Sequence, residues 1–138
     1  MDKKNIISNI NPKSPSAEAY RILRTNIQFT NIDKTIKSIV ITSPGPGEGK
    51  TTIIVNLAAA MAQNNKKILL IDADLRKPCI HTFFELDNTK GITNVLSEDI
   101  EYTKIIQYTY IENFHILASG PIPDRKSTRL NSSHITIS

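Results

Sequence analysis

The chain has 138 residues, of which 39% are hydrophobic and 22% charged, and its formal net charge is +4. This length allows one domain at most. No apolar stretch approaches the ~20 residues that a membrane-spanning helix needs, and no signal peptide opens the chain. The basic residues are scattered, so no nucleic-acid partner is expected. Cys79 is the only cysteine, so no intrachain disulfide is possible. We expect Cys79 to have a packing role and the protein to be cytosolic.

The N-terminal part begins with residues 1–14, which lack hydrophobic periodicity and are predicted to form a flexible lead-in. A helix is expected over about 16–29. Glu18, Arg21 and Arg24 fall at i, i+3 and i+6 on it, so their side chains share a broad face. From these residues alone, the simplest interpretation is a solvated face with one Glu18–Arg21 ion pair.

A strand predicted over 38–42 leads into a glycine-rich segment that reads Thr-Ser-Pro-Gly-Pro-Gly-Glu-Gly-Lys-Thr-Thr. Gly45, Gly47 and Gly49 carry no Cβ and permit unusual dihedrals, so backbone N–H groups can surround a cluster of phosphate oxygens. The usual spacing of a phosphate loop asks for glycine where this chain has Pro44. An ordinary glycine-rich turn between a strand and a helix is therefore the alternative interpretation.

A helix predicted over 50–64 follows this loop and is apolar nearly all round, as expected for a helix packed against a sheet. Lys50 can reach the β- and γ-phosphates of a nucleoside triphosphate, and the Thr51 hydroxyl is placed to ligate Mg²⁺. The amino end of the helix adds partial positive charge. The segment predicts a site for ATP or GTP, with the nucleotide-binding residues Gly45, Pro46, Gly47, Glu48, Gly49, Lys50, Thr51 and Thr52.

A second strand, predicted over 67–72, is apolar without alternation, which is typical of a strand buried on both faces of a parallel sheet. It ends in Asp72-Ala73-Asp74-Leu75-Arg76. Two carboxylates at i, i+2 lie on one side of an extended chain, at the strand end where open α/β sheets bind ligands. Because Mg²⁺ is held by carboxylates together with substrate phosphates, Asp72 and Asp74 join Thr51 as candidate metal-site residues. Backbone capping is the alternative for an Asp-x-Asp turn.

The remaining elements are weaker. We expect a turn or short helix near 81–85, helical pieces at 92–98 and 101–107, and a strand at 114–118. Alternating β and α elements predict a parallel sheet with right-handed crossovers.

The last segment, 124–138, is polar and has no helix or strand period long enough for a core element. Back-translated, it fits a nucleotide sequence similar to a common sequencing-library adapter, so we interpret it as a non-native tail. A natural disordered tail is the alternative.

The glycine-rich loop and the Asp-x-Asp-x-Arg segment together resemble the bacterial tyrosine kinases (BY-kinases) of capsule and exopolysaccharide synthesis, where they are the Walker A and Walker A′ motifs. The helix with Glu18, Arg21 and Arg24 is similar to that family's Glu-x-x-Arg-x-x-Arg helix, and residues 113–123 resemble the strand and turn before its third nucleotide motif. The resemblance implies an α/β fold of the P-loop NTPase kind, a parallel sheet flanked by helices. Residues 15–123 would be a partial kinase domain, truncated before the Walker B strand.

The resemblance implies an ATP- and Mg²⁺-dependent, autophosphorylating protein-tyrosine kinase that regulates capsular or exopolysaccharide synthesis and export, the fragment itself being inactive. In this interpretation Lys50 holds the phosphates, Asp72 accepts the tyrosine proton and Asp74 supports the metal through water. Arg76 either stabilises charge or anchors the loop. The face with Glu18 would mediate ring-like self-association. A membrane-spanning polysaccharide co-polymerase would activate the kinase and hold it at the cytoplasmic side of the cell membrane.

A second candidate is a P-loop ATPase of the division-site or plasmid-partition type, which acts as a nucleotide-dependent dimer switch. Those proteins carry a signature lysine five residues before the phosphate-loop lysine, and here that position is Gly45. This alternative also gives no reason for the Arg-Lys-Pro sequence after Asp74.

Overall fold

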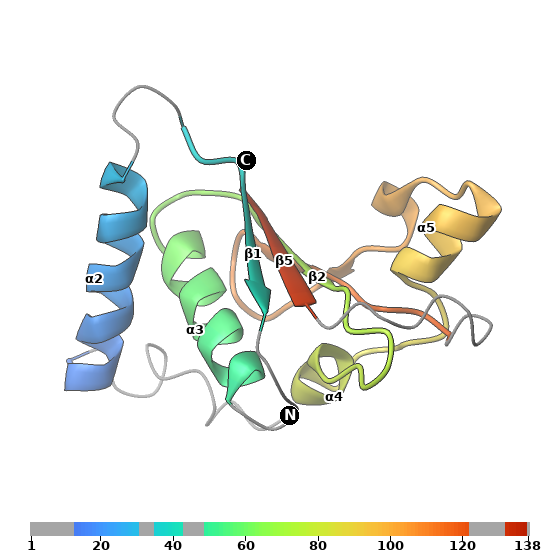
Figure 1. Ribbon diagram of the computed structural model, residues 1–138, viewed down its shortest axis with the longest axis horizontal. Helices are drawn as coiled ribbons and strands as arrows, with labels where there is room; N and C mark the ends of the chain where they lie inside the picture. The colour runs from blue at the N-terminus through green and yellow to red at the C-terminus, as the bar shows by residue number, and fades with distance from the viewer. Residues whose placement is uncertain (1–12, 31–34, 43–48, 122–131, 138) are drawn as a thin grey trace.

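The computed structural model describes residues 13–30, 35–42, 49–121 and 132–137. Figure 1 shows a sheet with α2 and α3 side by side at one end and α5 at the other. The elements are α2 (Pro15–Phe29), β1 (Ser38–Thr42), α3 (Lys50–Ala62), β2 (Ile68–Asp72), α4 (Ile80–Phe84), α5 (Ile92–Glu98), the 3₁₀ helix η2 (Tyr102–Lys104), β3 (Gln107–Tyr108), β4 (Phe114–Leu117) and β5 (Ser132–Ile137). None of the described helices is both long enough and apolar enough to cross a membrane.

The five strands lie in the order β1-β5-β2-β4-β3. β2 pairs with β4 in parallel, whereas β5 is antiparallel to both of its neighbours and β3 is antiparallel to β4. The predicted α/β class, a sheet flanked by helices, is confirmed. The prediction that the sheet is parallel holds for β2 and β4 and is wrong for the strands on either side of them.

The strand β5 is the largest departure from the sequence-based expectation, which assigned no core element to 124–138. Ile135 is fully buried and lies opposite Leu70 of β2 and Ile39 of β1 in the ladder. The physical reason is the short alternation in His134-Ile135-Thr136-Ile137, which places both isoleucines on one face of a strand. Four residues of alternation are enough when strands on both sides supply hydrogen-bonding partners. Residues 124–131 lie outside the described part of the chain.

The core lies between α3 and one face of the sheet. α3 is buried over its last nine residues, which fits its apolar sequence, because such a helix can be covered on several sides. The buried cluster consists of Ile54, Val55, Leu57, Ala58, Ala59, Met61, Ala62, Ile68, Leu70, Ile80, Phe84, Phe114, Ile116 and Ile135. The ring of Phe84 meets that of Phe114 edge-on at 5.5 Å between centroids, which fixes α4 against β4.

One predicted helix was only partly right. Of the helical piece expected at 101–107, only the single 3₁₀ turn of η2 forms, and Gln107 and Tyr108 enter the sheet as β3. The side chain of Gln107 explains the change, because its amide accepts from Asp87 N at 3.1 Å and donates to Asp87 O at 2.7 Å. These tertiary bonds favour the extended backbone over the local helical preference.

Candidate nucleotide site

The amino end of α3 lies opposite the loop that follows β2. Gly49 precedes the helix with φ of +74°, a left-handed conformation that side chains disfavour, and the space where a Cβ would sit is open. Its carbonyl accepts the first helical bond, from Ile53 N at 3.0 Å. Lys50 and Thr51 therefore begin the helix at the edge where β1 and β2 end. Gly45, Pro46, Gly47 and Glu48 lie outside the described residues.

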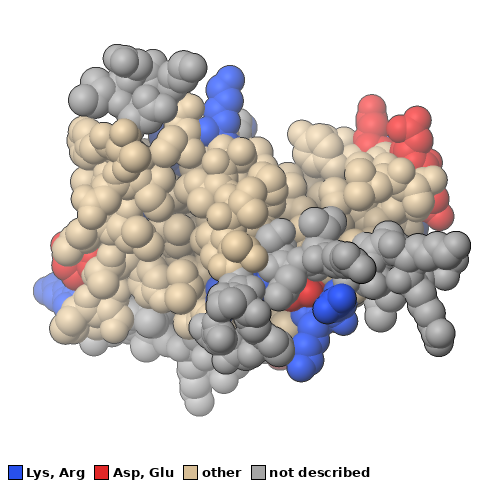
Figure 2. Space-filling model, viewed as in Figure 1, with Lys and Arg blue, Asp and Glu red and all other residues tan. Residues whose placement is uncertain are grey.

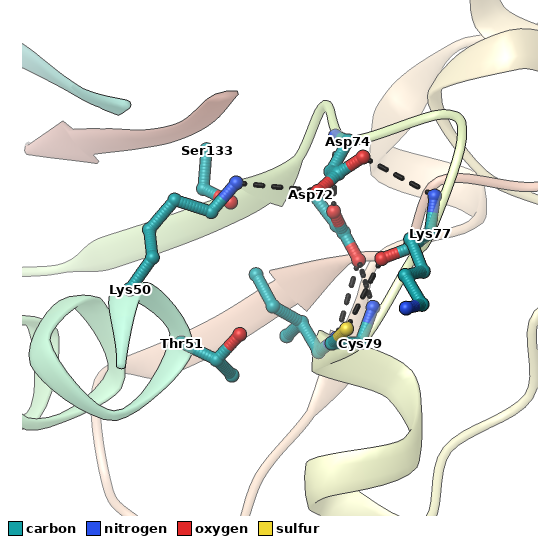
Figure 3. A pocket seen from close by; sticks show the side chains of 8 residues that line it. Lys50, Thr51, Asp72, Asp74, Lys77, Cys79 and Ser133 are labelled. Atoms are coloured by element: carbon teal, nitrogen blue, oxygen red, sulfur yellow. Dashed lines mark hydrogen bonds and ion pairs between the residues drawn. The ribbon is translucent and has the colours of Figure 1, made fainter. Parts of the chain in front are cut away.

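A small pocket joins these elements (Figure 3). Its lining includes four of the predicted site residues, Lys50, Thr51, Asp72 and Asp74. The others that line it are Lys77, Cys79, Ile80 and Ser133. Among the described residues no group of three or more His, Cys, Asp or Glu side chains forms a metal cluster.

Asp74 makes an ion pair across this pocket with Lys50. Lys50 Nζ lies 3.3 Å from Asp74 Oδ2, and the two side chains are only 11% and 14% exposed. The other oxygen, Asp74 Oδ1, accepts a hydrogen bond from Lys77 N at 3.2 Å. A cation from the helix and a carboxylate from the strand end are thus held together, with little water around them.

Asp72 organises the loop between β2 and α4. Its Oδ1 accepts from Asp74 N at 3.1 Å, and its Oδ2 accepts from Cys79 N and Ile80 N, both at 3.2 Å. Burial raises the pKa of the Asp72 carboxyl above its ordinary value, although the three backbone bonds oppose this shift. The Asp72 side chain therefore caps backbone N–H groups, as the alternative interpretation of the Asp-x-Asp turn predicted. It also lines the pocket.

Two predicted site residues do not reach the pocket. Arg76 is exposed and is not among the residues that line it. Thr52 is also exposed, and its carbonyl accepts from Asn56 Nδ2 at 2.8 Å within α3. In a helix that starts at Lys50, a residue two positions later points to another side than the first residue does.

Sequence reasoning missed three polar pocket residues. Cys79 was expected to have a packing role and is exposed, with its thiol donating to Lys77 O at 3.0 Å. The presence of Lys77 and Cys79 in the pocket could have been predicted from the sequence. The loop that contains them runs from Asp72 to the start of α4, so it must pass the end of β2, where the pocket lies. Ser133 had no such signal, since it reaches the pocket only through the register of β5, where it lies opposite Asp72.

The three residues of the Glu-x-x-Arg-x-x-Arg pattern do not act together. Arg21 pairs with Glu18 on the surface, with Arg21 Nη2 and Glu18 Oε2 at 2.7 Å. Arg24 points the other way, and its Nη1 donates to Ala60 O of α3 at 2.6 Å. The single broad face predicted from i, i+3, i+6 spacing is thus divided between solvent and the α2–α3 contact.

A family model described as an AAA domain matches residues 36–122. That range starts just before β1 and continues past β4, so it contains every described pocket residue except Ser133. The chain belongs to the AAA domain family. The tyrosine-protein kinase YwqD of Bacillus subtilis (strain 168) is 47% identical to this chain over 130 residues, which are 94% of this chain and 55% of YwqD. The chain therefore spans little more than half the length of this curated relative.

Solved structures with related sequences share the fold. The crystal structure of the chimerical protein CapA2B2 superimposes with a TM-score of 0.81 and 44% identity, over 90% of this chain and 54% of that one. The kinase domain of the Escherichia coli tyrosine kinase Etk gives 0.77 and 33%, over 86% and 47%. The resemblance to bacterial tyrosine kinases and the P-loop NTPase-like fold are confirmed.

A structure of the other candidate class is also similar. The septum site-determining protein MinD of Pyrococcus horikoshii OT3, complexed with Mg-ADP, gives a TM-score of 0.52 and 30% identity, over 60% of this chain and 34% of that one. The agreement covers less of the chain than that with the kinase domains. The division-site ATPase is therefore the less supported of the two candidates.

Proposed function

We propose that this chain is the nucleotide-binding part of an ATP- and Mg²⁺-dependent protein-tyrosine kinase that autophosphorylates and regulates capsular or exopolysaccharide synthesis and export. The observation that carries the proposal is the Lys50–Asp74 ion pair at 3.3 Å, beside Asp72 at the end of β2. The pair brings together a cation that would bind phosphate and a carboxylate that would bind Mg²⁺ near the amino end of α3. The sequence identity to YwqD, a tyrosine-protein kinase, supports the same conclusion.

The described residues fit a nucleotide and Mg²⁺. The left-handed Gly49, with space beside it among the described residues, lies at the amino end of α3, where the helix dipole favours anions such as phosphate oxygens. One hydroxyl, from Thr51, and two carboxylates converge on the same pocket, which is the oxygen set that Mg²⁺ prefers. Bound Mg²⁺ would neutralise negative charge on the phosphoryl groups during transfer.

The residues divide the work in the following way. Lys50 binds phosphate oxygens, and Thr51 and Asp74 hold the metal. Asp72 accepts the proton of the attacking tyrosine hydroxyl. A carboxylate offers about four acceptor positions, and three of those of Asp72 are used by backbone N–H groups, which leaves one for this proton. Its raised pKa makes it a stronger base than an exposed aspartate.

The activity is proposed for the full-length gene product, because the chain spans only 55% of YwqD. The test is phosphotyrosine formed by that product with ATP and Mg²⁺. Lys50→Met should remove it, and Asp72→Asn should remove it while retaining much of the ATP affinity. If the parent hydrolyses ATP and forms nucleotide-dependent dimers without phosphotyrosine, the ATPase of the MinD type replaces the kinase. Undiminished phosphotyrosine in Asp72→Asn would assign the base elsewhere.

Self-association and a membrane partner are part of the same proposal. We propose that α2 mediates ring-like assembly through Glu18 and Arg21, the ion-paired members of its pattern, whose side chains are 57% and 28% exposed. Arg21→Ala in the full-length protein should then shift the mass measured by light scattering towards the monomer, and an unchanged mass would contradict the interface. Substituting Arg24 together with Arg21 would be a poor test, because Arg24→Ala also breaks a contact inside the chain.

The proposed location is the inner face of the cell membrane, reached through a membrane-spanning polysaccharide co-polymerase that activates the kinase. The support is the resemblance to kinases of envelope polymer synthesis. Co-expression with a membrane protein encoded beside this gene should raise the phosphotyrosine yield and move the kinase to the membrane fraction. Equal yield and distribution with and without that protein would refute the activator.

A further inference from the structure

The helix α2 lies along α3, the helix that carries Lys50 and Thr51 at its amino end (Figure 1). Ala17 of α2 is fully buried, and Tyr20 and Ile27 pack against the core cluster that α3 dominates. These contacts fix one side of α2 on α3. On the face shown in Figure 2, the Lys and Arg side chains lie at separate points rather than in one patch. One arginine of α2, Arg24, is half-buried.

The side chain of Arg24 completes the carboxyl end of α3. The last carbonyl groups of a helix have no partner within it. Here Gln63 N donates to Ala59 O and Asn64 N donates to Met61 O, both at 3.1 Å. The carbonyl between them, that of Ala60, accepts from Arg24 Nη1 at 2.6 Å. The arginine thus supplies the donor that the following backbone does not.

The charge of Arg24 suits this position. The carboxyl end of a helix carries a partial negative charge, and a cation there stabilises the helix, most strongly when it is partly buried. The cost of the arrangement is visible, because Arg24 Nε is buried without a hydrogen-bond partner in the described part of the chain. The half-buried side chain keeps its charge-assisted bond to Ala60 O despite this cost.

The two ends of α3 are coupled by its rigidity. A helix of 13 residues is roughly 20 Å long at ~1.5 Å per residue, and α3 is buried on the sheet from Ile54 to Ala62. A shift of its carboxyl end is therefore transmitted to Lys50, whose Nζ must stay near Asp74. We propose that Arg24 is a positioning residue for the nucleoside triphosphate site: it caps α3, and through it α2 becomes part of the phosphate-binding unit.

The inference rests on the proposed nucleotide binding and is tested on the whole 138-residue chain. Binding of Mg·ADP is measured by calorimetry for the parent, Arg24→Ala, Arg24→Lys and the control Gln28→Ala, an exposed residue of the same helix. Arg24→Ala should weaken binding about 3- to 10-fold, the range expected for a partly buried cap. Arg24→Lys should recover most of the affinity, because an ammonium can also donate to Ala60 O. Gln28→Ala should bind like the parent.

Hydrogen exchange provides a second readout that needs no nucleotide. Amides at the end of α3, from Ala60 to Asn64, should exchange faster in Arg24→Ala than in the other three proteins. Parental affinity in Arg24→Ala would overturn the positioning role, and parental exchange would overturn the cap. A parent that binds no Mg·ADP would refute the proposed function, and the exchange rates would still decide whether Arg24 caps α3.

Discussion

Gly91 offers a sharp test of how the carboxyl end of β4 is held. It precedes α5 with φ of −170°, an extended conformation open to any residue, so only space decides whether a side chain is tolerated. A Cβ at this position would overlap backbone atoms of Ala118, Ser119 and Gly120. Backbone cannot rotate away as the end of a side chain can. Gly91→Ala must therefore push the start of α5 away from the turn after β4.

The cost can be worked out from the bonds across that contact. Ile92 N donates to Ala118 O at 2.9 Å, and Thr93 N donates to Ser119 O at 3.1 Å. Ala118 and Ser119 are buried. If α5 moves away from the turn, their carbonyl groups lose these hydrogen bonds, and water reaches them poorly. Each broken bond costs ~1–3 kcal/mol when a buried partner stays unsatisfied. We expect Gly91→Ala to lower the free energy of unfolding by about 2–6 kcal/mol, the sum for the two bonds.

The assay is urea unfolding, with Gly49→Ala as the matched control. Gly49 differs in both respects: its φ is +74°, and among the described residues no heavy atom beyond its chain neighbours lies within 4 Å of the position of a Cβ. Its substitution should cost only the ~1–2 kcal/mol of a left-handed side chain. If Gly91→Ala is no less stable than Gly49→Ala, the turn after β4 is not packed against α5 as described.

Two further predictions concern Asp72 and β5. Because burial raises the pKa of Asp72 above 3.8, the folded protein holds this proton more tightly than the unfolded chain. This group's stabilisation is present below the unfolded value and is lost as pH rises through the folded one. Relative to Asp72→Asn, the parent should gain stability in urea unfolding between pH 7 and pH 4, and a constant difference would contradict the shift. Ile135→Ala should lower the free energy of unfolding by ~2–4 kcal/mol, because Ile135 is fully buried. Ile137 is half-buried, so Ile137→Ala should lower it by less. Equal small losses in the two variants would mean that β5 is not part of the core.

The parts of the fold that could be predicted are those whose signal is local. The continuous apolar runs of α3 and β2 can be satisfied only by burial, so their bounds and order follow from the sequence. The pairing of Asp74 with Lys50 was also accessible, because a helix that starts after one strand and a loop that follows the next meet at the same edge of an α/β sheet. Local residue spacing and this one topological rule were sufficient to bring Lys50 and Asp74 to the same edge of the sheet.

The features that could not be predicted depend on contacts between distant segments. Nothing near Arg24 in the sequence indicates that it meets Ala60, because the contact depends on how α2 crosses α3. The i, i+3, i+6 spacing shows that the three side chains share a side of the helix, and it cannot show where the boundary between solvent and neighbour falls. Gln107 is similar, since its bonds to Asp87 overrule a helical preference that is worth little per residue.

The strand β5 lies between β1 and β2 and separates these two strands in the sheet. β1 and β2 are each antiparallel to β5, so they run parallel to one another, as a crossover through α3 requires. They do not pair directly, and the space between them is one strand wide. Any strand in that space determines which groups face Lys50 and Asp72 at the ligand edge. In this chain an antiparallel strand brings its amino end there, with Ser133 opposite Asp72. A strand of the opposite direction would instead bring its carboxyl end to the pocket. The direction of this one strand therefore decides which of its ends supplies groups to the pocket, and here the amino end supplies Ser133.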